Sequence, residues 1–274
     1  MLEAALAGLF GLLIGSFLNV CIYRFPRDLS VVRPRSFCPE CEKPIAWYDN
    51  IPLLSYFLLK RRCRQCGKSI PARYPIVEAL TAALFFSFVA VLGPTWPALK
   101  YCLLSALLLG MIFADLEELI LPDEFTLGGM VAGLALSWVV PISDGIANML
   151  FSIAGWPPNT HAVSVAESIL GAVIPSGCLW LTGAVYERVR HKEGLGFGDV
   201  KMVAAIGAFL GLHYTLLTLI VGSLLGSVVG VVYILATRKD HTTYPLPFGT
   251  FLGVAAIGVS LVGQRVIAWY AKLL

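Results

Sequence analysis

The chain contains a succession of apolar segments, most of them long enough to cross a lipid bilayer as a helix. A crossing helix needs about 20 largely apolar residues. In agreement, 58% of the residues are hydrophobic, 14% are charged and the mean hydropathy is +0.80, values that are not typical of a soluble domain. We therefore expect an all-α polytopic membrane protein with about eight transmembrane helices. The expected spans cover residues 2–23, 75–93, 97–114, 125–141, 164–187, 199–212, 213–236 and 249–271.

Two of these segments have a second interpretation. The first apolar run follows no basic residue, and it leads into Asn19, Arg24 and Arg27 rather than a cleavage site, so we interpret it as a retained helix and not as a secretion signal. We divide the stretch 199–236 at residues 211–213. Its first part is short for a full crossing, which is typical of a half-length helix.

The basic residues are concentrated after the first apolar segment. Residues 24–73 hold 11 of the 20 Lys and Arg, and basic loops stay on the cytoplasmic side of a membrane. The same charge also suits anionic lipid headgroups, so membrane lipid is an expected partner. In the alternating topology, the further residues expected on the cytoplasmic side are Arg188, Arg190, Lys192, Lys201, Arg238 and Lys239, and those near the opposite face are Lys100, Arg265 and Lys272.

Two aspartates lie at the ends of apolar segments, Asp115 after the third and Asp199 at the start of the sixth. A carboxylate at the edge of hydrocarbon is costly to desolvate, so each is a candidate for chemistry. The expected topology brings both to the same membrane face. Two carboxylates held close together share one proton and provide an acid and a base, as in the aspartic-protease reaction.

Each aspartate also has a simpler interpretation as a helix cap or a solvated interfacial group. Asp199 in particular begins a helix, where unpaired backbone N–H groups favour a carboxylate. Asp123 follows Pro122, which is typical of a turn or a helix start. The acidic residues expected in a solvated cytoplasmic loop are Glu117, Glu118, Asp123 and Glu124.

Three alternating glycines, Gly194, Gly196 and Gly198, precede Asp199. Glycine permits unusual backbone angles and the close approach of another chain, such as a substrate strand. The pattern lacks the strand and helix context of a dinucleotide site, so we do not interpret it as nucleotide binding, and we expect no nucleic-acid partner.

Four cysteines form two CxxC pairs in the basic segment, Cys38 with Cys41 and Cys63 with Cys66, separated by 21 residues. Four thiolates at this spacing suit a tetrahedral zinc site. Disulfides are the alternative, although a cytoplasmic segment should not depend on them. A basic segment of about 50 residues builds little core, so a structural metal would stabilise it. The cysteines in apolar runs, expected to be packing residues, are Cys21, Cys102 and Cys178.

Seven motifs follow one another along nearly the whole chain. They are GSFLNVCIYR at 15–24, the two CxxC pairs, DNIPLLSY at 49–56, RYPIVE at 73–78, DLEELILPDEFTL at 115–127, EGLGFGDVKM at 193–202 and LPFGTFL at 246–252. Together they resemble the motifs of the type IV prepilin peptidases. Seven motifs in order are far more specific than any one of them.

The resemblance implies a multi-pass enzyme of the bacterial inner membrane. It implies an aspartic endopeptidase that removes the basic leader of prepilins or pseudopilins on the cytoplasmic side, usually after a glycine. Asp115 and Asp199 match the family's catalytic pair. The bifunctional members also methylate the new α-amine with S-adenosylmethionine, and the zinc segment accompanies that activity. The parts expected are a transmembrane helix over 1–23, a cytoplasmic zinc-binding lobe over 24–74 and a membrane aspartic peptidase domain over 75–274.

The residues that bind the methyl donor are unknown from the sequence, because residues 24–78 contain no nucleotide-binding fingerprint. Arg73, Tyr74 and Glu78 are the first candidates, and the alternative is a structural link that packs the lobe onto the next helix. Rival functions are a peptidase without methyl transfer, a proton-coupled transporter and a scaffold of a pilus or secretion assembly. Neither the particular substrates nor the oligomeric state follows from the sequence.

Overall fold

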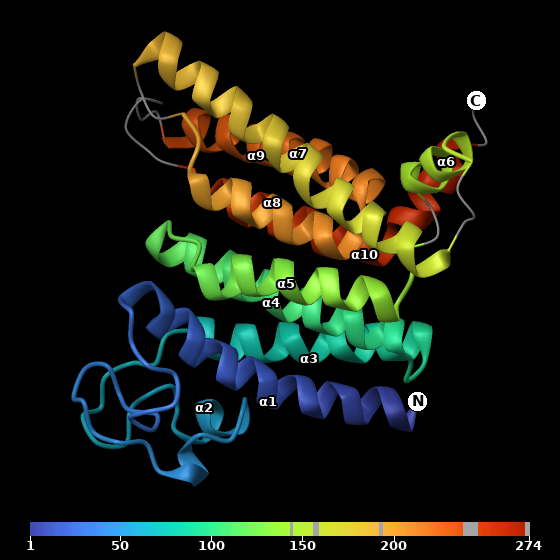
Figure 1. The fold of residues 1–274 in the computed structure, drawn as a ribbon. Helices are drawn as coiled ribbons and strands as arrows, with labels where there is room; N and C mark the ends of the chain where they lie inside the picture. Colours follow the sequence, from blue (N-terminus) through green and yellow to red (C-terminus); the bar gives the residue numbers. More distant parts are fainter. Residues whose placement is uncertain (143–144, 156–158, 192–193, 238–245, 272–274) are drawn as a thin grey trace. The chain divides into compact units, whose positions relative to one another are not determined.

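The structure is a computed structural model that describes residues 1–142, 145–155, 159–191, 194–237 and 246–271. The described chain is built of helices and divides into two compact units, Met1–Gly110 and Met111–Leu274 (Figure 1). Helix α4 (Trp96–Glu118) contributes residues to both units. The units group the helices differently from the three functional parts expected from the sequence, and that functional division stays a prediction.

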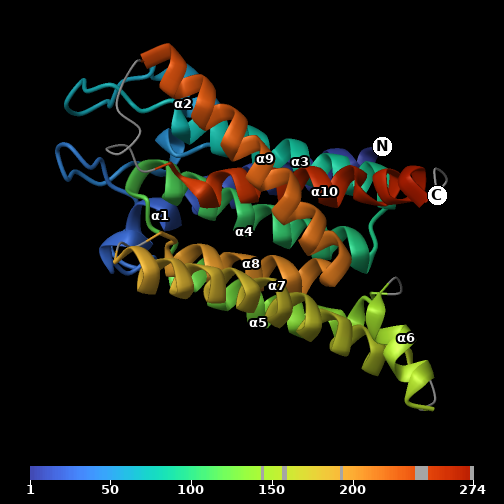
Figure 2. The ribbon, with the colours of Figure 1, turned by 90° about the horizontal axis from the view of Figure 1, so that it is seen from above.

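In the first unit, helices α1 (Leu2–Arg24) and α3 (Arg73–Leu92) lie side by side (Figures 1 and 2). Two glycines of α1 permit this contact. A Cβ atom at Gly11 would lie 2.8 Å from the Ala82 Cα atom, and one at Gly15 would lie 2.7 Å from the Glu78 Cα atom. Small residues four positions apart are a common basis for close helix packing in membranes. A small apolar core is formed by Phe85, Phe88, Cys102 and Ala106.

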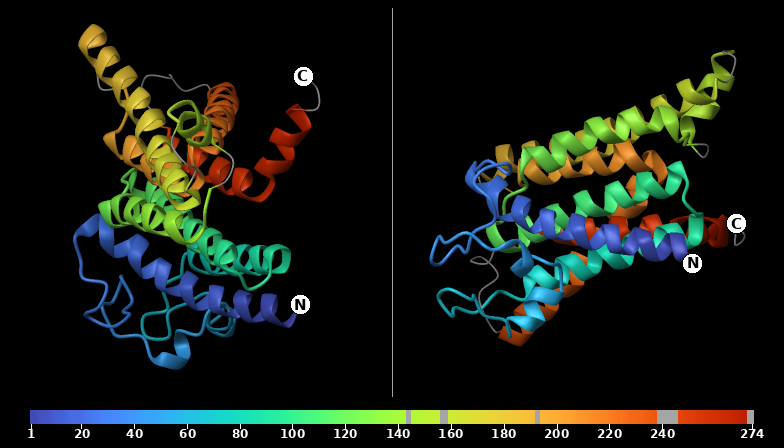
Figure 3. Two further views of the ribbon diagram at one scale, coloured as in Figure 1. Left: turned by 45° about the vertical axis from the view of Figure 1, so that its right-hand side comes forward. Right: turned by 90° about the horizontal axis from the view of Figure 1, so that it is seen from below.

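The segment between α1 and α3 is a lobe of loops and short turns (Figure 3). Its helical pieces are the 3-10 turns η1 (Phe25–Arg27) and η2 (Trp47–Asp49) and helix α2 (Leu54–Leu58). The buried Arg24 side chain at the end of α1 donates hydrogen bonds to the carbonyls of Ser30 and Pro34. Backbone and side-chain hydrogen bonds therefore hold a lobe that has little apolar core of its own.

In the second unit, α5 (Asp123–Val139), α7 (Thr160–Arg190) and α8 (Phe197–Leu210) pack against one another, and α9 (Leu212–Thr237) packs against α10 (Phe248–Ala271) (Figures 1 and 2). Glycines again form the contacts.

A side chain at Gly207 of α8 would collide with the Gly171 carbonyl of α7, and a Cβ atom at Gly133 of α5 would lie 2.9 Å from the Ala208 carbonyl carbon.

Gly211 separates α8 from α9 with a φ of 78°, a left-handed conformation that favours glycine. The expected division of the stretch 199–236 at residues 211–213 is therefore confirmed. Helix α8 has 14 residues, which makes it about 21 Å long, shorter than the hydrocarbon core.

Glu167 of α7 joins two helix N-termini in the interior of this unit. Its side chain is only 1% exposed, and its two carboxylate oxygens accept the N–H groups of Ala147 in α6 (Ile146–Ile153) and of Leu212 in α9, each at 3.0 Å. Unpaired N–H groups at a helix start and the helix dipole both favour an anion there. The sequence did not single out Glu167.

The all-α membrane class expected from the sequence is confirmed, whereas the count of eight spans is not. Six described helices are long and apolar enough to cross a membrane. The two expected spans that fall short are α5, with 17 residues, and α8. Helix α4 also continues to Glu118, so Glu117 and Glu118 form its exposed last turn rather than a loop.

The segment 142–163 carries no interpretable motif, and the sequence alone predicts an outward-facing linker there. It contains α6, and the Asn159 side chain accepts the N–H of His161 to cap α7. Trp156, Pro157 and Pro158 of this segment lie outside the described residues. So do four of the basic residues used to orient the chain, which are Lys192, Arg238, Lys239 and Lys272.

We expect Gly11→Ala to destabilise the protein relative to Gly8→Ala. Both changes add one methyl group to α1, so the gain in helix propensity is shared. The Gly11 methyl would meet the α3 backbone, whereas a Cβ at Gly8 would have its nearest contacts at an ordinary 3.5 Å. Overpacking of this kind costs about 1–3 kcal/mol, or several degrees in Tm. Thermal unfolding in detergent checks this, and equal midpoints for the two variants would contradict the α1–α3 packing.

Candidate active site and cysteine cluster

Asp199 lies in the first turn of α8. The helix begins at Phe197 after Gly196, whose φ of −67° and ψ of 132° give the extended backbone of an N-cap. Asp199 is the third residue of the helix, and Gly196 occupies the N-cap position, so N-capping does not account for the Asp199 carboxylate. Its side chain is partly exposed.

The glycines before Asp199 permit the close approach of other groups. Gly196 has a φ of −67°, and neither it nor Gly198 has a φ in the left-handed region. A Cβ atom at Gly198 would lie 3.1 Å from Leu121, and one at Gly194 would collide with the Tyr186 ring. The chain's own side chains therefore take up the space that the glycines leave.

Asp115 lies one turn before the end of α4 and is 5% exposed. Its Oδ2 atom accepts the backbone N–H of Thr250 at 2.7 Å and the Thr250 hydroxyl at 2.9 Å. Thr250 is the third residue of α10, so Asp115 satisfies the first turn of another helix rather than the end of its own. The expected capping role is thus realised between two helices.

Gly249 brings the two aspartates to one place. A Cβ atom at this glycine would lie 3.2 Å from Asp115 Oδ2 and 3.2 Å from Asp199 Oδ1. The two oxygens are therefore no further apart than twice this distance, and the charge of Asp115 acts on Asp199. The structure brings together the two residues that the sequence singled out, although they are 84 positions apart.

The arrangement can perform acid–base chemistry. Two carboxylates this close cannot both ionise without strong repulsion, so the pair titrates as a unit and holds one proton over a wide pH range. An ionised partner that activates water and a protonated partner that polarises a carbonyl are the requirements for peptide hydrolysis by an aspartate pair.

The other acidic residues near Asp115 do not share this site. Asp123 begins α5 after Pro122, as the sequence indicated, and its exposed carboxylate forms an ion pair with Lys201 of α8. Glu124 is likewise exposed. Exposed ion pairs contribute about 0–1 kcal/mol, so this pair is a minor link between helices.

The four lobe cysteines form one cluster from two equivalent turns. In the first turn the Cys38 N–H donates to the Lys43 carbonyl, and in the second the Cys63 N–H donates to the Lys68 carbonyl. Glu42 and Gly67 have positive φ values of 55° and 71° at equivalent positions. The second turn uses the residue type that favours this conformation, and the first does not.

The cluster fits a tetrahedral metal ion. All four Sγ atoms lie within 4.8 Å of one another, and those of Cys38 and Cys66 are 3.9 Å apart. Four Zn–S bonds of about 2.3 Å place the sulfur atoms about 3.8 Å apart. The N–H groups of Cys66 and Gln65 lower the pKa of the Cys63 thiol to about 7, whereas burial raises the pKa of the Cys38 thiol, so Cys63 is the ligand that ionises most readily without a metal.

All seven cysteines are free thiols, so the disulfide alternative is not realised. Cys21 and Cys102 are buried and pack as expected. Cys178 is exposed on α7, so its expected packing role within the chain was wrong.

The residues first considered for the methyl donor link α3 to the lobe. The Glu78 carboxylate accepts the Leu53 N–H at 2.8 Å, and the Tyr74 carbonyl accepts a hydrogen bond from the Asn19 amide at 3.0 Å. The Arg73 guanidinium lies over the Tyr74 ring at 4.6 Å. These contacts support the structural alternative, and Tyr74 and Glu78 also line a cavity in this unit.

The sequence indicates Gly249 and Thr250 only as part of the motif LPFGTFL at 246–252, with no role in arranging the aspartates. The available signal was Pro247, two residues before a Gly-Thr pair at the start of an apolar run, which indicates a helix N-terminus. Such a signal predicts unpaired N–H groups but not the carboxylate that accepts them.

The fold and the paired carboxylates define a class, the multi-pass α-helical membrane proteins with an aspartate pair. Family comparison matches residues 9–92 to the bacterial peptidase A24 N-terminal domain and residues 102–231 to the type IV leader peptidase family. The chain belongs to the type IV leader peptidase family.

Similar curated proteins support the same membership. The prepilin leader peptidase/N-methyltransferase of Aeromonas hydrophila is 36% identical, over 97% of this chain and 93% of the relative. The corresponding protein of Neisseria gonorrhoeae is 34% identical over 88% and 85%. The type 4 prepilin-like proteins leader peptide-processing enzyme of Escherichia coli O78:H11 is 36% identical over 92% and 91%. No solved structure matches the chain.

We expect Thr250→Val to lower kcat for leader-peptide cleavage about tenfold with little change in KM. Valine keeps the shape and the backbone N–H but removes the hydroxyl that donates to Asp115. A hydrogen bond to a charged group contributes about 1.5–3 kcal/mol, and 1.4 kcal/mol is tenfold in rate. Thr250→Ser, which keeps the hydroxyl, should restore most of the rate. Steady-state kinetics on a purified prepilin check this, and a serine variant as slow as the valine variant would contradict a positioning role for the hydroxyl.

Proposed function

We propose that the chain is a leader peptidase that cleaves the basic leader of type IV prepilins or pseudopilins, with Asp115 and Asp199 as its catalytic pair. One observation supports this above the others. Asp115 Oδ2 and Asp199 Oδ1 each lie 3.2 Å from the position that a Cβ atom of Gly249 would occupy. The relatives are named for this reaction.

The two aspartates have different surroundings, which supports different roles. Asp115 accepts two hydrogen bonds from Thr250, and such bonds stabilise the ionised form. We therefore assign the negative charge to Asp115 and the shared proton to Asp199. Asp115 then takes a proton from the attacking water while Asp199 donates its proton to the scissile carbonyl oxygen. The resulting gem-diol collapses with a proton passing to the leaving amine, and the pair returns to its starting state.

The reaction takes place at the cytoplasmic face of the inner membrane in this proposal. The basic segment 24–73 is expected on that side, together with the ends of the helices that carry the aspartates. The apolar helix of a prepilin stays in the bilayer while its basic leader stays in the cytoplasm. The membrane therefore places the scissile bond at the interface, which lowers the entropic cost of positioning it.

N-methylation of the new terminus is the second activity of the proposal. Relatives that align with most of the chain are named as N-methyltransferases as well as leader peptidases, and the lobe 24–74 is present here. When bound, S-adenosylmethionine would supply an electrophilic methyl group to the neutral α-amine; the C–S bonding electrons would stay on sulfur, and the methylated ammonium would exchange its extra proton with water. We further propose that Cys38, Cys41, Cys63 and Cys66 hold a structural zinc ion.

We expect Asp115→Asn and Asp199→Asn each to lower the rate of leader cleavage by a factor of about 10² to 10⁴ or more, because each removes one partner of the acid–base pair. The matched control is Asp123→Asn, which removes the charge of an exposed aspartate in the same unit. It should stay within a few-fold of the wild-type rate. Mass spectrometry of the prepilin product gives the rates. An Asp199→Asn enzyme that processes prepilin at the wild-type rate would exclude the assignment.

We expect the purified protein to contain equimolar zinc and Cys38→Ser to lose most of it, since a thiolate ligand is replaced by a poor one. Loss of the metal should also expose the lobe to trypsin, because the lobe has little apolar core and many basic residues. Cys178→Ser, the same change at an exposed cysteine of α7, should retain the metal. Elemental analysis and limited proteolysis measure both effects. Unchanged metal content in Cys38→Ser would contradict the zinc assignment.

A further inference from the structure

The first unit contains a cavity of about 300 Å³, a size within the range of small-ligand sites. It is lined by the end of α1, the start of α3 and the lobe. Polar groups and aromatic rings both face it, the combination typical of sites for small organic molecules. The lining residues that matter for recognition are Asn19, Tyr48, Asp49, Tyr56, Tyr74 and Glu78.

Asn19 presents an unpaired acceptor at this cavity. Its side chain is 1% exposed, and its amide nitrogen donates to the carbonyls of Gly15 at 3.2 Å and Tyr74 at 3.0 Å. Those two carbonyls fix the amide orientation, because only the nitrogen can donate to them. The Oδ1 atom is buried without a hydrogen-bond partner. A buried unpaired acceptor is destabilising, so its presence at a cavity indicates a ligand that donates a hydrogen bond.

Glu78 presents an uncompensated negative charge at the same cavity. Its side chain is 7% exposed, and its described partners are the Leu53 N–H, at 2.8 Å, and the Ser16 side chain. Neither partner carries a positive charge. A buried carboxylate is costly to desolvate without a cation, so this wall favours a cationic ligand. Leu53 itself has a φ of 58° and a ψ of −50°, a strained conformation of the kind found at ligand sites.

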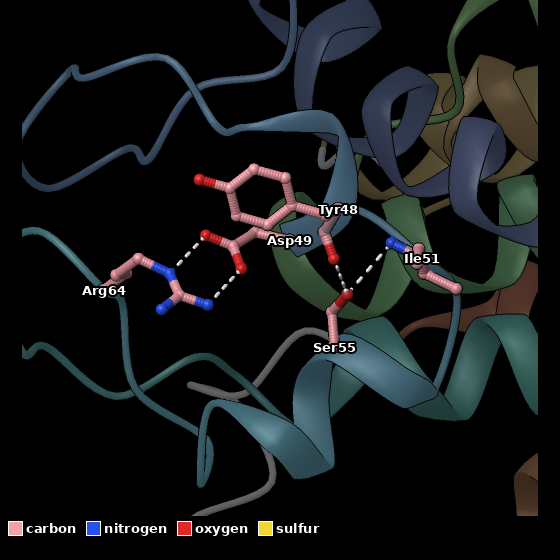
Figure 4. A network of polar contacts seen from close by, with 5 residues as sticks. All are labelled: Tyr48, Asp49, Ile51, Ser55 and Arg64. Atoms are coloured by element: carbon pink, nitrogen blue, oxygen red, sulfur yellow. Dashed lines mark hydrogen bonds and ion pairs between the residues drawn. The ribbon is translucent and has the colours of Figure 1, made fainter.

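A second lining carboxylate, Asp49, is already compensated by a positive charge (Figure 4). The Arg64 guanidinium donates two hydrogen bonds to it, both at 2.7 Å, and these hold the pKa of Asp49 below its usual range. The Ser55 hydroxyl donates to the Tyr48 carbonyl at 3.1 Å and accepts the Ile51 N–H at 3.0 Å, which fixes the Tyr48 backbone (Figure 4). This wall is ordered by its own bonds. A third lining carboxylate, Glu40, is exposed and forms an ion pair with Lys68 at 3.8 Å, so Glu78 is the buried carboxylate that a ligand cation would meet.

We propose that this cavity binds S-adenosylmethionine, with Glu78 supplying the negative charge and Asn19 Oδ1 accepting a hydrogen bond from the ligand. The inference rests on the proposed N-methylation. The ligand matches what the cavity presents: it carries a sulfonium and an ammonium, it offers N–H and O–H donors, and its adenine ring suits the tyrosine faces.

Ligand binding measured without turnover tests the proposal. Titration calorimetry on the full-length protein in detergent, with S-adenosylmethionine and with S-adenosylhomocysteine, reports affinity independently of methyl transfer. We expect Glu78→Gln, which keeps the shape and an acceptor for the Leu53 N–H, to weaken binding of S-adenosylmethionine about tenfold or more. The control Glu3→Gln, at an exposed residue in the first turn of α1 outside the cavity lining, should bind as the wild type does.

A comparison of the two ligands shows which positive charge of S-adenosylmethionine, the sulfonium or the ammonium, lies near Glu78. S-adenosylhomocysteine lacks the sulfonium charge but keeps the ammonium, so a loss confined to S-adenosylmethionine supports recognition at sulfur. An equal loss for both supports recognition at the amine. Wild-type affinity in Glu78→Gln, with unchanged zinc content and thermal midpoint, would overturn the proposal.

A second variant keeps the test decisive if Glu78→Gln does not fold. Val20→Phe adds volume at the cavity wall and removes no hydrogen bond, so it should abolish binding of both ligands. Wild-type affinity in Val20→Phe overturns the site. If the wild type methylates a processed pilin and yet Val20→Phe binds normally, the location fails while the function stands. If the wild type neither binds the donor nor transfers methyl, the proposed methylation fails with it.

Discussion

The hydrogen bonds from Thr250 to the buried carboxylate of Asp115 hold the candidate active site together. One of them pairs the Thr250 N–H in the first turn of α10, which would otherwise lie unpaired in an apolar interior, and both attach α10 to the end of α4. The residue just before Thr250 is Gly249, and this attachment places it beside both carboxylates. A structural requirement of a membrane helix and the geometry of a reaction are thus met by one contact.

A second buried acid shows what distinguishes a structural carboxylate from a reactive one. Glu167 also accepts N–H groups from helix starts, but it uses both oxygens for them, at the N-termini of α6 and α9. Among the described residues, Asp115 accepts its hydrogen bonds through Oδ2, and Asp199 lies beyond the N-cap position of its own helix. The proposed catalytic pair therefore keeps an oxygen, Asp115 Oδ1, without a described hydrogen bond, whereas both oxygens of Glu167 already accept one. In a membrane protein, burial of an acid alone does not indicate catalysis.

Much of the fold, the two aspartates and the four lobe cysteines could be predicted from the sequence. Each depends on a local signal or on a characteristic spacing of residues. Apolar length predicted the helices, and the CxxC spacing predicted the cluster. Helices α5 and α8 were counted as membrane spans on their composition but are too short for a full crossing. Pro122 precedes the start of α5, and Gly196 and Gly211 flank α8. Gly249, Thr250 and Glu167 could not be predicted, because their roles depend on which helix starts meet which carboxylates. That information exists only after the helices pack.

The cysteine cluster and the cavity of the first unit are linked through sequence neighbours. Arg64 follows Cys63 directly, and the two hydrogen bonds that it donates to Asp49 order one wall of the cavity. The lobe has few buried apolar residues to hold Arg64 in place, so the cysteine cluster is the main constraint on it. On this reasoning a structural metal and a methyl-donor site belong together physically: the metal orders a small lobe well enough for one side of a ligand cavity to be built from loops. Loss of the cluster should then disturb the Asp49 wall, while the Glu78 and Asn19 side, carried on α3 and α1, keeps the support of helix packing.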